Sequence, residues 1–227
     1  MIATQIQRLT EQFPKEVTLV AVSKTKPISA LEEAYNAGHR DFGENKVQEL
    51  CQKAEAMSSE IRWHMIGHLQ RNKVKYIAPF VHLIHGVDSE RLLVEVNKQG
   101  AKNNRIIDVL IQIHIAEESS KFGFSYAEAV TLFSNENPYP NVRVIGLMGM
   151  ATFTIDKGQV KREFSTLSAF YSYWTTIKLL SVPSMGLSND YAIAISSGSD
   201  MVRFGSLIFG SLNLVYVRSF RRGIHRL

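Results

Sequence analysis

One lysine in this sequence lies where a nucleophilic amine would be useful. Lys24 follows the apolar run Leu19–Ser23, which indicates a buried parallel strand, and Pro27 ends the pattern three residues later. The carboxyl ends of such strands are where α/β folds place their functional residues. Partial burial there would lower the pKa of an ammonium group and free the amine to attack a carbonyl carbon. Lys24 is therefore a candidate for a lysine that forms a Schiff base.

A candidate anion site lies near the other end of the chain. The segment Met201–Arg203 indicates a short strand that continues through Gly205 and Ser206 into a helix. Backbone N–H groups at a helix N-terminus bind phosphate, and the helix dipole favours negative charge there. Ser188 precedes another predicted helix, where its hydroxyl could cap the helix or bind a phosphate oxygen. A reactive lysine and a phosphate site together fit pyridoxal 5'-phosphate.

Arg203, at the end of the last predicted strand, has two interpretations. It could form an ion pair with a nearby carboxylate, and Asp200 is the first candidate. It could instead face the nitrogen of a pyridine ring and keep that nitrogen unprotonated, because a guanidinium cannot act as an acceptor. A ring held in this way is a weaker electron sink than a ring paired with aspartate.

Composition restricts the class of protein. The chain has 227 residues, of which 45% are hydrophobic, enough for one large core or two small ones. No apolar run approaches the roughly 20 residues of a membrane span, and the first residues lack the layout of a signal peptide. Cys51 is the only cysteine, so no intrachain disulfide can form and we expect a cytoplasmic protein.

The formal charge of +5 could indicate a nucleic-acid partner, but its distribution argues against one. Four arginines lie in the last ten residues, and without them the chain is close to neutral. A neutral body is poor support for a nucleic-acid groove. We therefore expect a solvated basic tail over residues 211–227, with neither nucleic acid nor membrane as a partner.

The histidines raise the question of a metal site. His64 and His68 are four residues apart, and His82 and His85 are three apart. Gly67 interrupts the first pair, and a strand would direct the second pair to opposite faces. Because no cluster of thiols or carboxylates accompanies them, we expect hydrogen bonding in the core or at its rim and no metal site.

Short apolar runs alternate with amphipathic segments along the whole chain. The predicted strands are Thr18–Ser23, Arg40–Phe42, Arg62–Ile66, Val81–His85, Ile107–His114, Val144–Met148, Pro183–Gly186 and Met201–Arg203. The predicted helices are Ser29–Ala37, Lys46–Met57, Leu69–Ile77, Ser89–Asn103, Ser125–Ser134, Lys157–Leu180 and Asp190–Ser197, after an extra helix over Met1–Phe13.

This alternation predicts an α/β fold, a single (β/α)₈ TIM-like barrel with an extra N-terminal helix. A doubly wound open sheet is the alternative, because alternation does not distinguish a closed sheet from an open one. In the barrel the first and last strands are neighbours, so Lys24 and Arg203 would lie at one mouth. No linker or internal repeat divides the chain, and we expect one domain over residues 1–227.

Five motifs, in order along the chain, resemble the pyridoxal phosphate homeostasis protein family. They are Ala21–Pro27, Phe42–Asn45, Trp63–Lys73, Ser184–Asp190 and Gly198–Gly210. The resemblance covers the chain from about Leu19 to Gly210. It implies a barrel similar to the N-terminal domain of bacterial alanine racemase that binds pyridoxal 5'-phosphate.

The resemblance also implies roles for individual residues. Lys24 falls on the position of the Schiff-base lysine, and Arg203 falls on the arginine that faces the pyridine nitrogen. Asn45 falls on a residue that lines the ring. Phosphate-binding positions of the family fall on three further residues, which are Ser188, Gly205 and Ser206.

Two further lysines, Lys26 and Lys121, resemble positions of accessory amines that the family is thought to use in cofactor transfer. The sequence departs from the family at Asp200, where a neutral residue is usual, and over residues 211–227. A carboxylate at position 200 could pair with Arg203 or weaken phosphate binding. The departure over the tail concerns the packing of the C-terminal helix and does not affect Lys24.

The family is described as a cofactor carrier without an established reaction, so we expect a binding protein in vitamin B6 homeostasis and not an enzyme. The alternative is an amino-acid racemase. Racemases of this type take a second base from an added domain of the partner subunit, and the chain ends shortly after its last strand. Tyr191 or His85 could replace that base, but neither has a context that places it across the ring. The expected partners are pyridoxal 5'-phosphate and the client enzymes that use it, and we expect a monomer.

Overall fold

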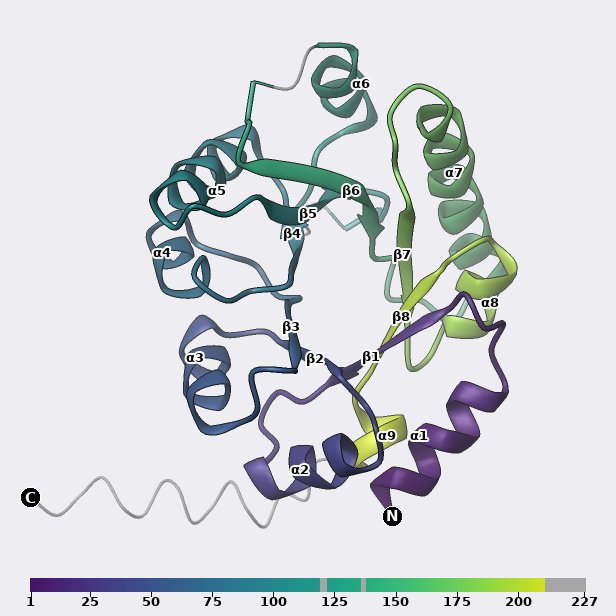
Figure 1. Cartoon of the computed structure of the whole chain (residues 1–227). Helices are drawn as coiled ribbons and strands as arrows, with labels where there is room; N and C mark the ends of the chain where they lie inside the picture. The colour runs from purple at the N-terminus through teal and green to yellow at the C-terminus, as the bar shows by residue number, and fades with distance from the viewer. Residues whose placement is uncertain (119–121, 136–137, 211–227) are drawn as a thin grey trace, which may run out of the picture.

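The computed structural model describes residues 1–118, 122–135 and 138–210 (Figure 1). The strands are β1 (Thr18–Val22), β2 (Asp41–Glu44), β3 (Arg62–Met65), β4 (Leu83–Val87), β5 (Ile107–Ile113), β6 (Val142–Gly149), β7 (Val182–Leu187) and β8 (Met201–Phe204). The helices are α1 (Ile2–Glu11), α2 (Ile28–Asn36), α3 (Val47–Ala56), the 3₁₀ turn η1 (Arg71–Lys73), α4 (Val74–Ile77), α5 (Glu90–Lys102), α6 (Tyr126–Ser134), α7 (Lys157–Thr175), α8 (Tyr191–Ser196) and α9 (Ser206–Phe209).

The eight strands form a closed parallel barrel in the order of the sequence, and the helices surround it (Figure 1). Closure joins β1 to β8 in parallel, with Val20 opposite Arg203. The helix α1 precedes β1 and packs against α2 and α9. The predicted (β/α)₈ barrel with an extra N-terminal helix is therefore confirmed, and the open sheet is excluded.

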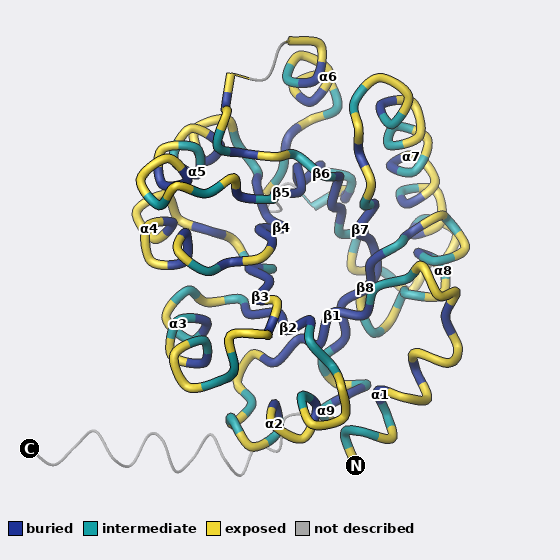
Figure 2. The backbone as a smooth tube through the Cα atoms, viewed as in Figure 1, coloured by how far each residue is buried: buried dark blue, intermediate teal, exposed yellow. Residues whose placement is uncertain are grey.

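Both faces of the strands are buried, which explains why the sequences of the strands are continuous apolar runs. Along β1, Leu19 and Ala21 belong to the large core between the barrel and its helices, whereas Val20 belongs to a smaller cluster inside the barrel. That inner cluster also contains Leu83 and Met148 from β4 and β6. Figure 2 shows the buried strands at the centre and exposed residues on the outer faces of the helices.

Two predicted helices differ in extent from the observed ones. The segment predicted as a helix over Leu69–Ile77 begins in extended backbone and contains only the turn η1 and the short α4. Leu69 is buried without being helical, and its apolar side chain produced the misleading pattern. The helix expected to reach Leu180 ends at Thr175, whose hydroxyl donates to the carbonyl of Tyr171 at 2.7 Å.

Across the ranges that the structure describes, no helix is long and apolar enough to cross a bilayer.

Candidate functional site

The residues expected to bind the cofactor lie at the carboxyl ends of the strands. Asn45 directly follows β2, Ser188 directly follows β7, and Gly205 directly follows β8. Lys24 lies two residues beyond the end of β1. Because the strands are parallel and the barrel is closed, these ends form one rim. The topology therefore brings the candidate residues to the same mouth.

The amine of Lys24 is accessible at this rim. The residue is exposed, so the expected partial burial is not found. Within the described ranges, no hydrogen bond or ion pair engages its ammonium group. Thr25, which follows it, has a φ of 63°, an unusual conformation for a β-branched residue. Lys24 therefore directly precedes a residue in a strained conformation, and none of the described residues engages its amine.

Arg203 points into the barrel. It lies opposite Val20 in the β1–β8 pair, and residues in register on parallel strands share a face. Its side chain is buried, and among the described residues its hydrogen-bond partner is the carbonyl of Gly149, at 3.4 Å from Nη2. Burial lowers the pKa of Arg203 to about 10, although the carboxylate of Asp190 opposes this shift. The guanidinium is therefore charged at neutral pH and largely unpaired.

The ion pair considered between Arg203 and Asp200 is not formed. Asp200 precedes β8, and its backbone bonds to Thr18 and Pro183 at the end of the barrel away from the mouth. Burial raises the pKa of Asp200, and the nearby carboxylate of Glu16 adds to this effect. The departure from the family pattern at position 200 therefore lies away from the rim.

A chain of polar side chains crosses the barrel interior near β2, β3 and β4. Arg62 donates to Asp41 through Nε at 2.7 Å, and Asp41 Oδ1 lies 3.0 Å from His64 Nε2. His64 Nδ1 lies 2.9 Å from His85 Nε2. His64, His68 and His85 thus form the expected side-chain hydrogen bonds, His68 through Nδ1, which lies 2.9 Å from Asp88 Oδ2. His82 instead packs edge-on against the ring of His64. Within the described ranges, no group of three or more histidine, cysteine or acidic residues is arranged to hold a metal ion.

The charges along this chain are fixed by burial and by hydrogen bonds. Burial opposes ionisation of Asp41, but bonds from His64 and Arg62 outweigh it and hold the pKa of Asp41 well below its usual range. Burial lowers the pKa of His85 far below its ordinary value, with smaller contributions from His64 and Arg203. His85 is therefore neutral at pH 7, and it lies close enough to Arg203 to sense its charge.

Three buried polar atoms inside the barrel have no hydrogen-bond partner among the described residues. They are Arg203 Nε, Ser184 Oγ and His85 Nδ1. Ser184 lies on β7, which pairs with β8, and it is in register with Met201, two residues before Arg203. Buried polar atoms in native proteins are rarely left unpaired. A ring nitrogen is an acceptor that suits the unpartnered Arg203 Nε.

The expected phosphate site consists of backbone N–H groups at the start of α9. Gly205 is the N-cap of this short helix and Ser206 is its first residue. The first N–H groups of a helix have no partner within it and can donate to an anion. Ser188 is not the cap of α8, because that helix begins after Asp190, whose carboxylate accepts from the N–H of Leu187 at 2.6 Å. The capping alternative for Ser188 is therefore wrong.

The family model described as alanine racemase, N-terminal domain, matches residues 1–213. This chain belongs to that family. It is 38% identical over 195 residues to a pyridoxal phosphate homeostasis protein of Aquifex aeolicus, covering 85% of this chain and 86% of that protein. The predicted resemblance to pyridoxal phosphate homeostasis proteins is thereby confirmed.

Solved structures of PipY from Synechococcus elongatus share the fold. The structure without pyridoxal phosphate is 30% identical with a TM-score of 0.89, and it covers 92% of this chain and 100% of that one. The structure with the cofactor bound is 29% identical with a TM-score of 0.85, at the same coverage of 92% and 100%. An alanine racemase of Clostridium difficile, at 11% identity, TM-score 0.76 and coverage of 93% and 57%, shares the fold alone.

Sequence reasoning missed a buried lysine that this family member carries behind the mouth. Lys53 on α3 is buried and donates to Glu44 Oε1 and Glu49 Oε1, each at 2.7 Å. Burial raises the pKa of Glu44, against the effect of the bonds from Lys53 and Ser23. Lys53 lies three residues after the core residue Leu50, and residues three apart lie on the same face of a helix. This spacing could have indicated from the sequence that Lys53 is buried.

Lys26, expected as an accessory amine, is engaged in the structure. Its Nζ donates to the carbonyls of Phe209 and Gly210, at 3.2 and 3.0 Å. These carbonyls close the short helix α9, so Lys26 ties the segment after β1 to the end of the expected phosphate helix. Lys121 and the basic tail over residues 211–227 lie outside the described residues.

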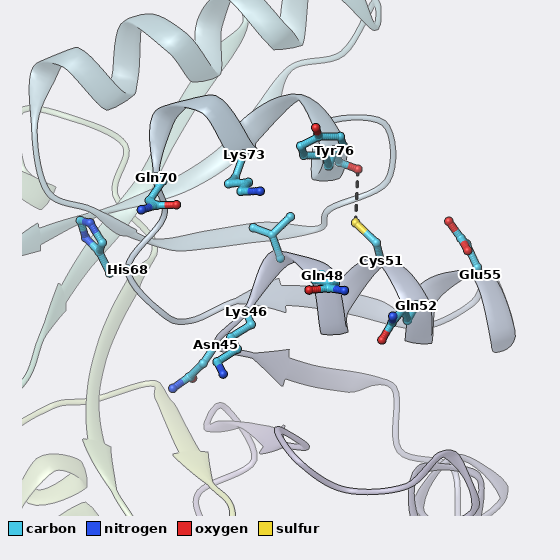
Figure 3. A pocket seen from close by; sticks show the side chains of 11 residues that line it. Asn45, Lys46, Gln48, Cys51, Gln52, Glu55, His68, Gln70, Lys73 and Tyr76 are labelled. Carbon is cyan, nitrogen blue, oxygen red and sulfur yellow. Dashed lines mark hydrogen bonds between the residues drawn. The ribbon is translucent and has the colours of Figure 1, made fainter. Parts of the chain in front are cut away.

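A separate cavity of about 590 Å³ lies beside the mouth, between α3 and the segment η1–α4 (Figure 3). Most of the residues that line it are polar by type, and Cys51 Sγ lies 3.7 Å from the carbonyl oxygen of Tyr76. Asn45 is the one expected cofactor residue in that lining. Because neither Lys24 nor Arg203 contributes to it, this cavity does not match the expected cofactor site.

Proposed function

We propose that this protein binds pyridoxal 5'-phosphate at the barrel mouth and acts as a carrier in vitamin B6 homeostasis. The observation that carries the proposal is the pair of an exposed Lys24 amine and a buried Arg203, whose Nε has no partner among the described residues. The name of the Aquifex aeolicus relative and the cofactor bound to PipY support it. The described barrel would act as one domain.

Lys24 is the residue proposed to hold the cofactor covalently as a Schiff base. Pyridoxal 5'-phosphate supplies an aldehyde, and a C=N bond to Lys24 Nζ would form with release of one water. Arg203 Nε would donate to the ring nitrogen and keep it unprotonated, because the guanidinium stays charged at neutral pH. Asn45, at the end of the neighbouring strand β2, would line the ring.

The phosphate is proposed to bind at the start of α9. The backbone N–H groups of Gly205 and Ser206 and the hydroxyl of Ser188 would donate to its oxygens. Gly205 has an ordinary φ of −108°, and a Cβ there would approach Val22 O no closer than 3.4 Å. Neither backbone conformation nor protein packing therefore requires this glycine. Its missing side chain leaves room beside the N–H groups, as a bound phosphate would need.

The racemase alternative needs a second base across the ring, and the two candidates are poorly suited to that role. Tyr191 packs edge-on against Phe13 and Phe204, and Phe204 lies in the core outside the barrel. His85 is wholly buried and already bonded to His64. These positions favour a carrier without a catalytic reaction of its own.

Three properties of the protein beyond the cofactor site stay predictions. Delivery of cofactor to client enzymes, a monomeric state and a cytoplasmic location rest on the sequence and on the family. An accessory role for Lys26 would first require release of its bonds to the end of α9.

The deciding experiment is borohydride reduction of the protein loaded with pyridoxal 5'-phosphate, followed by peptide mapping. We expect a pyridoxyl adduct on Lys24 that disappears in Lys24→Met and persists in the control Lys98→Met, a change at an exposed lysine. An adduct found mainly on Lys26 or Lys121 would refute the assignment. In parallel, sustained racemisation of L-alanine or D-alanine that disappears in Lys24→Met would show an enzyme instead of a carrier.

A further inference from the structure

A buried lysine lies directly behind the turn that carries Lys24. Lys53 is 5% exposed, and its Nζ donates to the carbonyl of Ser23 at 2.8 Å as well as to Glu44 and Glu49 at 2.7 Å. An ammonium group has three donors, and here all three are used. The side chain is therefore held in one orientation.

The two carboxylates bonded to Lys53 also hold both neighbours of Lys24. Ser23 Oγ donates to Glu44 Oε1 at 2.6 Å, and the backbone N–H of Thr25 donates to Glu49 Oε1 at 2.6 Å. A single ammonium group thus connects the residue before Lys24 with the residue after it. Among the described residues, the Lys24 side chain forms no hydrogen bond or ion pair with this cluster.

The turn held in this way is strained. Thr25 has a left-handed φ of 63°, which is unfavourable for a β-branched side chain. Such conformations persist only where the surrounding contacts impose them, and they gather at functional sites. The Thr25 hydroxyl donates to the carbonyl of Lys24 at 2.6 Å, but it is the bond to Glu49 that ties the turn to α3.

Stability alone does not explain a charged cluster at this place. Buried ion pairs are commonly no more stabilising than apolar residues of the same size, because both charges lose their hydration. Glu44 is completely buried, and its second oxygen has no partner among the described residues. A cluster with this cost is better explained by the backbone conformation that it imposes on the turn.

We propose that Lys53 is a positioning residue for Lys24. It acts through Glu44 and Glu49 to hold the turn over residues 23–25 in the conformation from which the Lys24 amine meets the cofactor aldehyde. Lys53 does not touch the cofactor. This proposal rests on the proposed function, because it concerns the covalent step at Lys24.

The test separates covalent capture from simple binding. In Lys53→Met, the rate of borohydride-trapped adduct formation on Lys24 should fall by about tenfold or more, because small displacements of a reacting group have large kinetic effects. The affinity for pyridoxine 5'-phosphate, which has the phosphate and ring but no aldehyde, should stay unchanged. The same substitution at exposed Lys98 should alter neither quantity.

A second variant guards against misfolding of Lys53→Met. Glu49→Gln keeps an oxygen for the Thr25 N–H but loses the charge that binds Lys53, and it should show a smaller loss of trapping rate. Adding Thr25→Gly to Lys53→Met should restore part of the rate, because glycine adopts this φ without strain.

Wild-type trapping rates in folded Lys53→Met and in Glu49→Gln would overturn the proposal. An equal loss of rate and of pyridoxine 5'-phosphate affinity would also overturn it, since that result would indicate a general collapse of the mouth. A wild-type protein that forms no adduct on Lys24 would instead refute the proposed function, whatever the variants do.

Discussion

The two sides of the barrel interior differ in how their polar groups are satisfied. On the side of β2 and β3, Asp41 accepts hydrogen bonds from Arg62 and His64, so each of these three side chains has a hydrogen-bond partner. On the side of β7 and β8, Ser184 Oγ and Arg203 Nε are buried without partners among the described residues. The polar groups on the first side are paired with one another, whereas two polar atoms on the second side are unpaired among the described residues.

His85 on β4 lies between the two sides, and only one of its two ring nitrogens has a hydrogen-bond partner among the described residues. Its Nε2 bonds to His64 at 2.9 Å, while its Nδ1 has no partner within the described part of the chain. Hydrogen bonds stabilise the charge on Asp41, but burial destabilises the charge on Arg203. Removing a charge should therefore have opposite consequences for the free energy of unfolding on the two sides.

The largest effect is expected on the paired side. Asp41→Ala should lower the free energy of unfolding by about 3 kcal/mol, because it leaves buried His64 without the partner that fixes it. Urea unfolding of the cofactor-free protein measures this change, with exposed Glu32→Ala as the control. If both variants lose the same small amount, the paired side does not stabilise the barrel.

The second prediction concerns the unpaired side. Arg203→Met should weaken binding of pyridoxal 5'-phosphate by about 1–3 kcal/mol, since a charge-assisted hydrogen bond is lost. The free energy of unfolding of the cofactor-free protein should not fall, because an unpaired buried charge is replaced by an apolar chain. Titration calorimetry and urea unfolding give the two values, with exposed Arg91→Met as the control. A loss of stability like that of Asp41→Ala would remove the contrast between the sides.

The third prediction is a pH dependence that arises from His85. Its folded pKa lies far below the unfolded value of about 6.5, so only the unfolded chain takes up the proton as the pH falls. The free energy of unfolding should therefore decrease by about 1 kcal/mol for each pH unit below about 6.5. Asp41, whose folded pKa is also lowered, adds a further loss below about pH 4.

Urea unfolding between pH 7 and pH 5 tests this dependence. The slope should flatten in His85→Gln but persist in part, because burial also lowers the pKa values of His39 and His82. An unchanged slope in His85→Gln would mean that His85 does not stay neutral in the folded protein.

The smallest effect is expected at Ser184. Removing an unpaired buried hydroxyl in Ser184→Ala should change the free energy of unfolding by less than about 0.5 kcal/mol or raise it. Ser199 is the matched control, since its hydroxyl lies 2.9 Å from both the N–H and the carbonyl of Met185, and Ser199→Ala should cost about 1 kcal/mol. Equal losses in the two variants would show that Ser184 has a partner after all.

Much of the fold and of the rim could be predicted because both leave local patterns. Leu19–Ser23 is apolar on both faces, and glycine and proline mark the ends of such segments. Lys24, Asn45 and Gly205 each follow a strand, and parallel strands end on one side. The exposure of Lys24 could not be predicted, because burial depends on what the neighbouring loops cover.

The alternation of strands and helices and the residue types at the strand ends follow from local sequence patterns. Only the tertiary structure decided that the sheet closes, that Arg203 lies opposite Val20 and away from any pairing with Asp200, and that Lys53 lies behind Lys24. This division arises because the periodicity of apolar residues shows only which face of a helix or strand is apolar. The register between strands and the packing of helices decide which side chains meet across it.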